Sequence, residues 1–190
     1  MNDKSSWIRR WFWKIVFVTI FVGSVALLAH SSKLKQTPSQ PGYYSINHFV
    51  DGDTIAVNMN GSVETVRMIG VDTPETHKPN TPVQCYGPQA ADYTKQFIGA
   101  NNVRLQADPQ DTNRDRYNRL LRYVYIPDGT MVEEALIKNG YGFAYTQFPF
   151  EKSDQFTALE QTAKSQHLGL WSACTVTVEA NGREQTNNAN

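Results

Sequence analysis

Between residues 45 and 126 the sequence alternates short apolar runs with turn signals, and a helix signal interrupts the series after its third run. Strands are expected at residues 45–50, 53–59, 63–71, 103–107 and 120–126. Asn60-Gly61, between the second and third runs, is a strong signal for a two-residue β-hairpin. Helices are expected from Gly87 to about Ile98, from Met131 to Asn139 and from about Asp154 to His167. This order predicts an α+β fold, an OB-type five-stranded Greek-key β-barrel with three α-helices.

The N-terminal part of the chain has a different composition. Residues 11–29 are predominantly apolar, and these 19 residues approach the length of about 20 that spans a bilayer as a helix. Arg9 and Arg10 precede the run, which predicts that residues 1–10 form a basic cytoplasmic N-terminus. The run is either an uncleaved transmembrane signal anchor or a cleavable signal peptide. The domain behind it is therefore expected outside the cytoplasm, held by a single membrane pass or secreted.

Composition also sets the remaining boundaries. Residues 30–43 are polar and contain proline, as a linker does, residues 44–174 form the globular domain, and residues 175–190 are expected to be a disordered tail. Outside the cytoplasm the two cysteines of the chain, Cys85 and Cys174, are able to form a disulfide, and two unrelated free thiols are the alternative. Residues 41–175 hold 11 Lys/Arg and 15 Asp/Glu. This mildly acidic domain is unsuited to gripping nucleic acid by bulk electrostatics.

Three short segments concentrate acids and arginines. They are residues 51–54 (DGDT), residues 66–76 (VRMIGVDTPET) and residues 115–119 (DRYNR). Taken singly, they are an Asp-Gly turn, a helix start and solvated charges. Taken together, they offer what phosphodiester hydrolysis needs: guanidinium groups for the phosphorus oxygens, a base for the attacking water, and oxygen ligands for a hard cation. The residues that offer this chemistry are Arg67, Arg119, Glu75, Asp53 and Asp72.

The motifs VDGDT, VRMIGVDTPET, CYGPQAADYTKQFI, DRYNRLLRYVYIPDGTMVEEALIKNGYGFAY and LGLW occur in this order from about residue 45 to residue 172. They resemble the thermonuclease family, typified by staphylococcal nuclease, here in a membrane-anchored or secreted form. The resemblance implies an OB barrel with three helices and a nuclease that cleaves DNA and RNA with one Ca²⁺ ion and leaves 3′-phosphate ends. No protein partner is inferred, and the membrane is a partner only if the N-terminal helix is uncleaved.

The resemblance also implies a role for individual residues. Asp53 and Asp72 correspond to carboxylate ligands of the metal, and Thr73 to a ligand through its backbone oxygen. Arg67 and Arg119 correspond to phosphate-binding arginines and Glu75 to the proposed general base. The residues that match the nucleotide pocket are Tyr117 and Tyr145.

The sequence departs from the family pattern in three places. Asn118 stands where glycine is usual, Gln147 stands where a second pocket tyrosine is expected, and the segment KPNTPVQC supplies Cys85. Two other interpretations remain open. One is a non-catalytic OB module that binds nucleic acid, and the other is an envelope structural domain in which the charged cluster is a salt-bridge network.

Overall fold

The structure is a computed structural model that describes residues 42–76 and 82–189, all within one compact unit of the chain. The predicted cytoplasmic N-terminus, the predicted membrane segment and nearly all of the predicted linker lie outside the described residues. Within the described ranges, no helix is long and apolar enough to cross a membrane.

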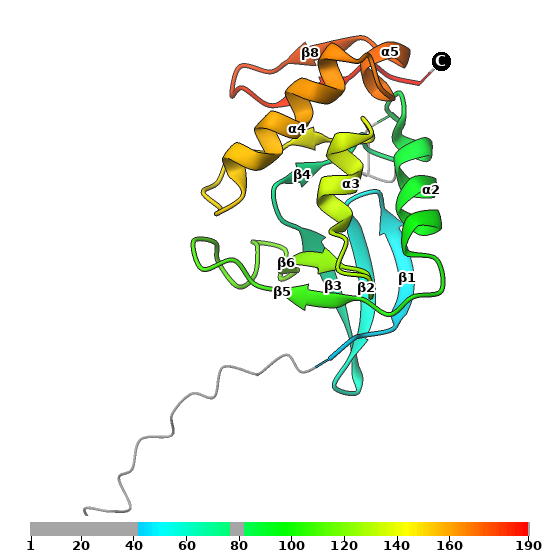
Figure 1. The fold of residues 1–190 in the computed structure, drawn as a ribbon, viewed down its shortest axis with the longest axis vertical. Coiled ribbons are helices and arrows are strands. Elements are labelled where there is room, and N and C mark those ends of the chain that lie inside the picture. Colours follow the sequence, from blue (N-terminus) through cyan, green and yellow to red (C-terminus); the bar gives the residue numbers. More distant parts are fainter. Residues whose placement is uncertain (1–41, 77–81, 190) are drawn as a thin grey trace, which may run out of the picture. The chain divides into compact units, whose positions relative to one another are not determined.

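A five-stranded sheet forms the centre of the described unit (Figure 1). Its strands, in spatial order, are β1 (Ile46–Asp51), β2 (Thr54–Met59), β3 (Ser62–Met68), β6 (Leu120–Tyr125) and β5 (Arg104–Gln106). Neighbouring strands are antiparallel except β3 and β6, which are parallel. Tyr44, ahead of β1, and Val103, ahead of β5, exchange two backbone hydrogen bonds of 2.8 Å. These bonds join the two edge strands, so the sheet closes as the predicted barrel requires.

The predicted hairpin between β2 and β3 is confirmed. Asn60 has φ 51° and Gly61 has φ 83°, and positive φ at both central residues is the mark of the type I′ turn that this dipeptide favours. Met59 lies opposite Ser62 in the resulting ladder. The turn therefore fixes the register that brings Thr54 opposite Arg67 at the far end of the same hairpin.

The three predicted helices are also confirmed, as α2 (Gly87–Ile98), α3 (Val132–Lys138) and α4 (Ser153–Ser165). A short helix that the sequence did not predict, α5 (Leu170–Ala173), follows α4. Figure 1 shows α2 running beside β1, with α3 between α2 and α4. The largest fully buried apolar side chains come from both strands and helices: Tyr123, Phe156, Ile55, Met68, Ile98, Leu136, Ile137 and Leu170.

The third predicted strand, residues 63–71, is in fact broken. β3 ends at Met68, and β4 (Val71–Asp72) pairs instead with β7 (Phe143–Ala144). Gly70 makes the break with φ 71°, and a Cβ at this position would lie 2.6 Å from the Phe150 ring. Only glycine fits such a left-handed, close-packed position without strain. The break turns Asp72 away from the barrel ladder toward β7.

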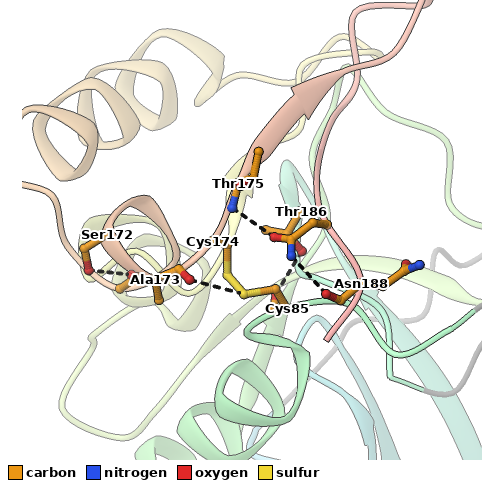
Figure 2. The surroundings of a disulfide bond; sticks show 9 residues. Cys85, Ser172, Ala173, Cys174, Thr175, Thr186 and Asn188 are labelled. Carbon is orange, nitrogen blue, oxygen red and sulfur yellow. Dashed lines mark hydrogen bonds between the residues drawn. A yellow bond between two sulfur atoms is a disulfide. The ribbon is translucent and has the colours of Figure 1, made fainter. Parts of the chain in front are cut away.

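The prediction of a disordered tail at residues 175–190 is wrong for residues 175–189, which the structure describes. β8 (Val176–Val178) and β9 (Glu184–Thr186) form an antiparallel hairpin. The expected disulfide between Cys85 and Cys174 is present at its base (Figure 2). The Cys85 N–H donates to Asn187 O at 2.7 Å, and Thr186 Oγ1 donates to Cys85 O at 2.8 Å. The segment has few apolar residues, and backbone pairing and the disulfide order it instead.

Asp108 is a buried carboxylate whose hydrogen bonds join β6 to neighbouring loops. Its side chain accepts hydrogen bonds from the Tyr123 hydroxyl and from the backbone N–H groups of Glu151 and Gln110. Burial alone would raise the pKa of Asp108, but these hydrogen bonds outweigh burial and lower it. The stabilisation is therefore complete above the unfolded-state pKa of about 3.9 and is lost as the pH falls through the lower folded-state pKa.

We expect Asp108→Asn to lower the free energy of unfolding by about 2 kcal/mol near neutral pH. The loss should shrink in acid, because protonation of Asp108 in the unfolded wild-type chain removes part of this stabilisation once the pH is below about 3.9. Urea denaturation at neutral pH and near pH 3 measures both values, with the exposed Asp92→Asn as the matched control. An equal loss at both pH values would contradict the assignment of a charged, hydrogen-bonded Asp108.

Candidate active site

Arg67, near the end of β3, joins two carboxylates that come from different strands. Its Nη2 lies 3.2 Å from Asp53 Oδ2 and 3.1 Å from Asp72 Oδ1. Its Nη1 donates to the carbonyl oxygens of Val71 at 2.7 Å and Met68 at 2.9 Å. The side chain is only 13% exposed. The guanidinium is thus fixed at the point where β2 begins and the chain turns into β4.

Asp53 is held by the residue that follows Asp72. The Thr73 backbone N–H and hydroxyl donate to Asp53 Oδ2 at 2.9 and 3.1 Å, and the Thr54 hydroxyl donates to Oδ1 at 2.9 Å. A Cβ at Gly52 would lie 2.7 Å from Thr73 Oγ1, so glycine at this position leaves room for the Thr73 side chain. The Asp-Gly-Asp-Thr segment is therefore more than a turn, because it brings Asp53 and Thr73 together.

The two carboxylates repel one another. Burial raises the pKa of Asp72, and the charge of Asp53 raises it further, while Arg67 and Arg183 oppose the shift. Burial would lower the pKa of Arg67, but the charges of Asp53, Asp72 and Glu75 together raise it. The positive charges of Arg67 and Arg183 therefore favour the ionised form of Asp72.

Glu75, the predicted base, is positioned by hydrogen bonds between its backbone and Gln84. Its N–H donates to Gln84 Oε1 at 2.8 Å, and the Gln84 N–H donates to Glu75 O at 2.9 Å. The Glu75 carboxylate lies 3.8 Å from Arg183 Nη2, and its side chain is 25% exposed. The carboxylate is thus both close to the charged cluster and accessible to water.

Arg119 lies just before β6, the strand that pairs with β3. The pairing of Arg67 with Leu121 places Arg119 two residues away, on the same face of the sheet, because side chains alternate along a strand. Its Nε donates to Asp115 Oδ2 at 2.7 Å. The structure therefore holds Arg119 immediately ahead of the neighbouring strand β6, paired with Asp115.

Asn118 does not disturb this loop. It adopts φ 65°, a left-handed conformation that asparagine tolerates better than most residues other than glycine. Asp115 Oδ1 accepts the backbone N–H groups of both Tyr117 and Arg119, at 3.0 and 2.9 Å. The replacement of glycine is thus compatible with the turn that presents Arg119.

The two predicted pocket tyrosines differ in their surroundings. Tyr145, after β7, lines a pocket of about 210 Å³ together with Asp72, Gln147 and Arg183. Tyr117 is 65% exposed and lies with its ring centroid 5.4 Å from the Arg119 guanidinium carbon.

Arg183 is a member of the cluster that the sequence did not predict. Its Nε lies 2.8 Å from Asp72 Oδ2, so each oxygen of Asp72 contacts a different arginine. A local signal existed, since Asn181-Gly182 lies between two short strand-like runs and is a hairpin dipeptide. Gln84 was also missed, because a glutamine in an irregular segment gives no hint that it holds a base.

The donor set fits a hard divalent cation. The Asp53 and Asp72 carboxylates converge on one cationic nitrogen, and oxygen ligands of this kind suit Ca²⁺ or Mg²⁺. Among residues 42–76 and 82–189, no group of three or more His, Cys, Asp or Glu side chains is arranged to hold a metal. An ion at Asp53 and Asp72 would therefore complete its shell with backbone, water or substrate oxygens, and Thr73 is the predicted backbone contributor.

The chain is similar in sequence to known proteins. Residues 65–173 match the family described as "Staphylococcal nuclease homologue". Endonuclease YncB of Bacillus subtilis is 42% identical over 156 residues, which cover 75% of this chain and 73% of that protein. Thermonuclease of Staphylococcus hyicus is 37% identical over 162 residues, or 83% of this chain and 94% of that protein.

A third relative is longer. SPbeta prophage-derived endonuclease YokF of Bacillus subtilis is 47% identical over 130 residues, or 67% of this chain, but the match spans only 43% of YokF. The family match covers more than half of the chain, and it contains Arg67, Asp72, Glu75 and Arg119. The chain therefore belongs to the staphylococcal nuclease family.

Proposed function

We propose that the chain is a Ca²⁺-dependent nuclease that hydrolyses phosphodiester bonds of DNA and RNA and leaves 3′-phosphate ends. The observation that carries the proposal is the bridge from Arg67 to Asp53 and Asp72, with Glu75 beside it. The resemblance to the family implies a metal ion, and relatives of this chain are named as endonucleases and a thermonuclease.

The chain's own residues supply distinct parts of the reaction. Glu75, at the water-accessible side of the cluster, accepts a proton from the attacking water. The new bond forms between this water oxygen and phosphorus, and the bond from phosphorus to the 5′-oxygen breaks. The 5′-oxygen leaves with the bonding electron pair and takes a proton from solvent, and the phosphate stays on the 3′ side. Arg67 and Arg119 stabilise the charge that develops on the phosphorus oxygens. For this, each arginine exchanges part of its present carboxylate pairing for phosphate.

The metal belongs with the carboxylates. Asp53 and Asp72 would hold it, with Thr73 contributing its carbonyl oxygen. When bound, Ca²⁺ supplies positive charge that offsets the charge of the phosphate in the transition state. Because the protein offers few ligands, we expect the ion to bind weakly alone and better when nucleic acid is present.

The enzyme is proposed to act outside the cytoplasm. The apolar run at residues 11–29 would export the domain, either as an anchor or as a cleaved signal. A disulfide between Cys85 and Cys174 suits an oxidising compartment.

Metal dependence is the first test. The full chain is incubated with single-stranded DNA in the presence of Ca²⁺ or of EGTA. Cleavage is expected with Ca²⁺ and should be abolished by EGTA, and added Ca²⁺ should restore it. If folded protein binds the DNA but cuts it in neither condition, the non-catalytic OB module is the correct function. If it neither binds nor cuts, the charged cluster is structural.

Individual residues give the second test. Glu75→Gln removes the base and Arg119→Ala removes a phosphate-binding cation, so each is expected to lower kcat/KM by at least a hundredfold. Initial rates of cleavage at saturating Ca²⁺ measure the effect. Glu134 and Arg104 are half-buried and lie away from the cluster, so Glu134→Gln and Arg104→Ala are the matched controls. Near-normal cleavage by either active-site variant would refute the role assigned to that residue.

A further inference from the structure

The C-terminal hairpin brings Arg183 into the charged cluster from outside the family's matched region, which ends at residue 173. Its Nε lies 2.8 Å from Asp72 Oδ2, and its Nη2 lies 3.8 Å from Glu75 Oε1. The side chain is 22% exposed, so part of it still faces solvent. Arg183 thus contacts both a predicted metal ligand and the predicted base.

The hairpin is joined to the same segment that holds Glu75. The disulfide ties Cys174, just ahead of β8, to Cys85 (Figure 2). The residues after β9 pair with the chain around Cys85: the Cys85 N–H donates to Asn187 O at 2.7 Å, and the Ala189 N–H donates to Val83 O at 2.8 Å. Gln84, which lies between Val83 and Cys85, is the residue whose side chain and backbone bond Glu75. Covalent and hydrogen-bonded links therefore fix the hairpin to the segment that holds the base.

Arg183 also borders open space beside the site. The residues that line the pocket of about 210 Å³ include Asp72, Tyr145 and Gln147, together with Gly182 and Arg183 of the hairpin. A Cβ built on Gly182 would lie 3.6 Å from Gln147 Nε2. The hairpin turn thus packs near the position where the family pattern has a tyrosine, and it brings a cation to this wall of the pocket.

Charge indicates what this cation does. The three carboxylates of Asp53, Asp72 and Glu75 are contacted by Arg67 and Arg183, whereas Arg119 is paired with Asp115. Without Arg183 the contacting set carries two net negative charges, and Arg183 lowers this to one. An added positive charge opposes a metal cation and favours a phosphate anion, and a guanidinium is suited to binding two phosphate oxygens at once.

We propose that Arg183 is a third phosphate-binding arginine of this active site, placed by the disulfide-anchored hairpin and held by Asp72 and Glu75 until nucleic acid binds. The proposal rests on the proposed nuclease function. It assigns a role to the C-terminal hairpin, which lies beyond the residues that match the family, and it makes one wall of the pocket a contact for the substrate backbone.

The test compares Arg183→Gln with Arg104→Gln, which removes the same charge from β5, away from the cluster. Binding of a fluorescently labelled single-stranded DNA is measured in EGTA at several salt concentrations, so that no cleavage interferes. Arg183→Gln is expected to weaken binding about tenfold or more and to lower the slope of log affinity against log salt by about 0.7, the value for one phosphate contact on a single strand. Arg104→Gln should leave the slope unchanged.

Calcium binding without nucleic acid separates this role from a structural one. Isothermal titration of the full chain with Ca²⁺ is expected to give tighter binding for Arg183→Gln than for wild type, because the ion no longer competes with a cation for Asp72. Loss of affinity for both Ca²⁺ and DNA, with an unchanged salt slope, would show that Arg183 only supports the fold and would overturn the proposal.

The disulfide supplies a second variant. Cys85→Ser/Cys174→Ser is expected to reproduce part of the loss in DNA affinity in the wild-type background and to add little in the Arg183→Gln background, since both changes remove the same contact. Fully additive losses would overturn the role of the anchored hairpin.

If wild type cleaves DNA with Ca²⁺ while Arg183→Gln binds DNA normally, this inference fails and the nuclease function stands. If wild type neither cleaves nor binds DNA, both fail.

Discussion

The contact of one Arg67 nitrogen with two carboxylates is the interaction on which the site depends. Asp53 and Asp72 are buried, at 7% exposure each, and an unpaired pair of buried like charges would be strongly unfavourable. The guanidinium makes the pair tolerable, and its other nitrogen is bound by backbone carbonyls at the turn into β4. The ends of β2, β3 and β4 therefore bring Asp53, Arg67 and Asp72 together. The surrounding fold holds these buried charges in positions that an isolated loop could not maintain.

The hairpin extends this principle to the end of the chain. Each oxygen of Asp72 contacts an arginine, Arg67 from the barrel and Arg183 from the C-terminal hairpin. The disulfide and the backbone pairing around Cys85 keep the hairpin on the segment that carries Glu75. The disulfide and the backbone hydrogen bonds that order the C-terminal hairpin therefore also place the Arg183 cation in the site.

Much of the barrel could be predicted from local sequence. The alternating apolar residues indicate strands, the Asn60-Gly61 dipeptide indicates the hairpin turn, and tertiary packing favours the same structures. The break at Gly70 could not, because it depends on the Phe150 ring, which is distant in sequence and lies where a Cβ would be. Asp53, Arg67 and Asp72 lie on short segments with fixed register, and the structure brings them together as the sequence led us to expect. Arg183 escaped prediction because its contacts follow from backbone pairing and a disulfide, which leave little trace in residue type.

The most direct test of the account is a crystal structure of the chain with Ca²⁺, with the ion located by its anomalous scattering. We predict an ion at about 2.3–2.6 Å from carboxylate oxygens of both Asp53 and Asp72, with the Thr73 carbonyl in its shell and Arg67 still beside the pair. A clearly bound ion elsewhere, or a saturating Ca²⁺ concentration that leaves Asp53 and Asp72 bridged by Arg67 without an ion, would contradict it.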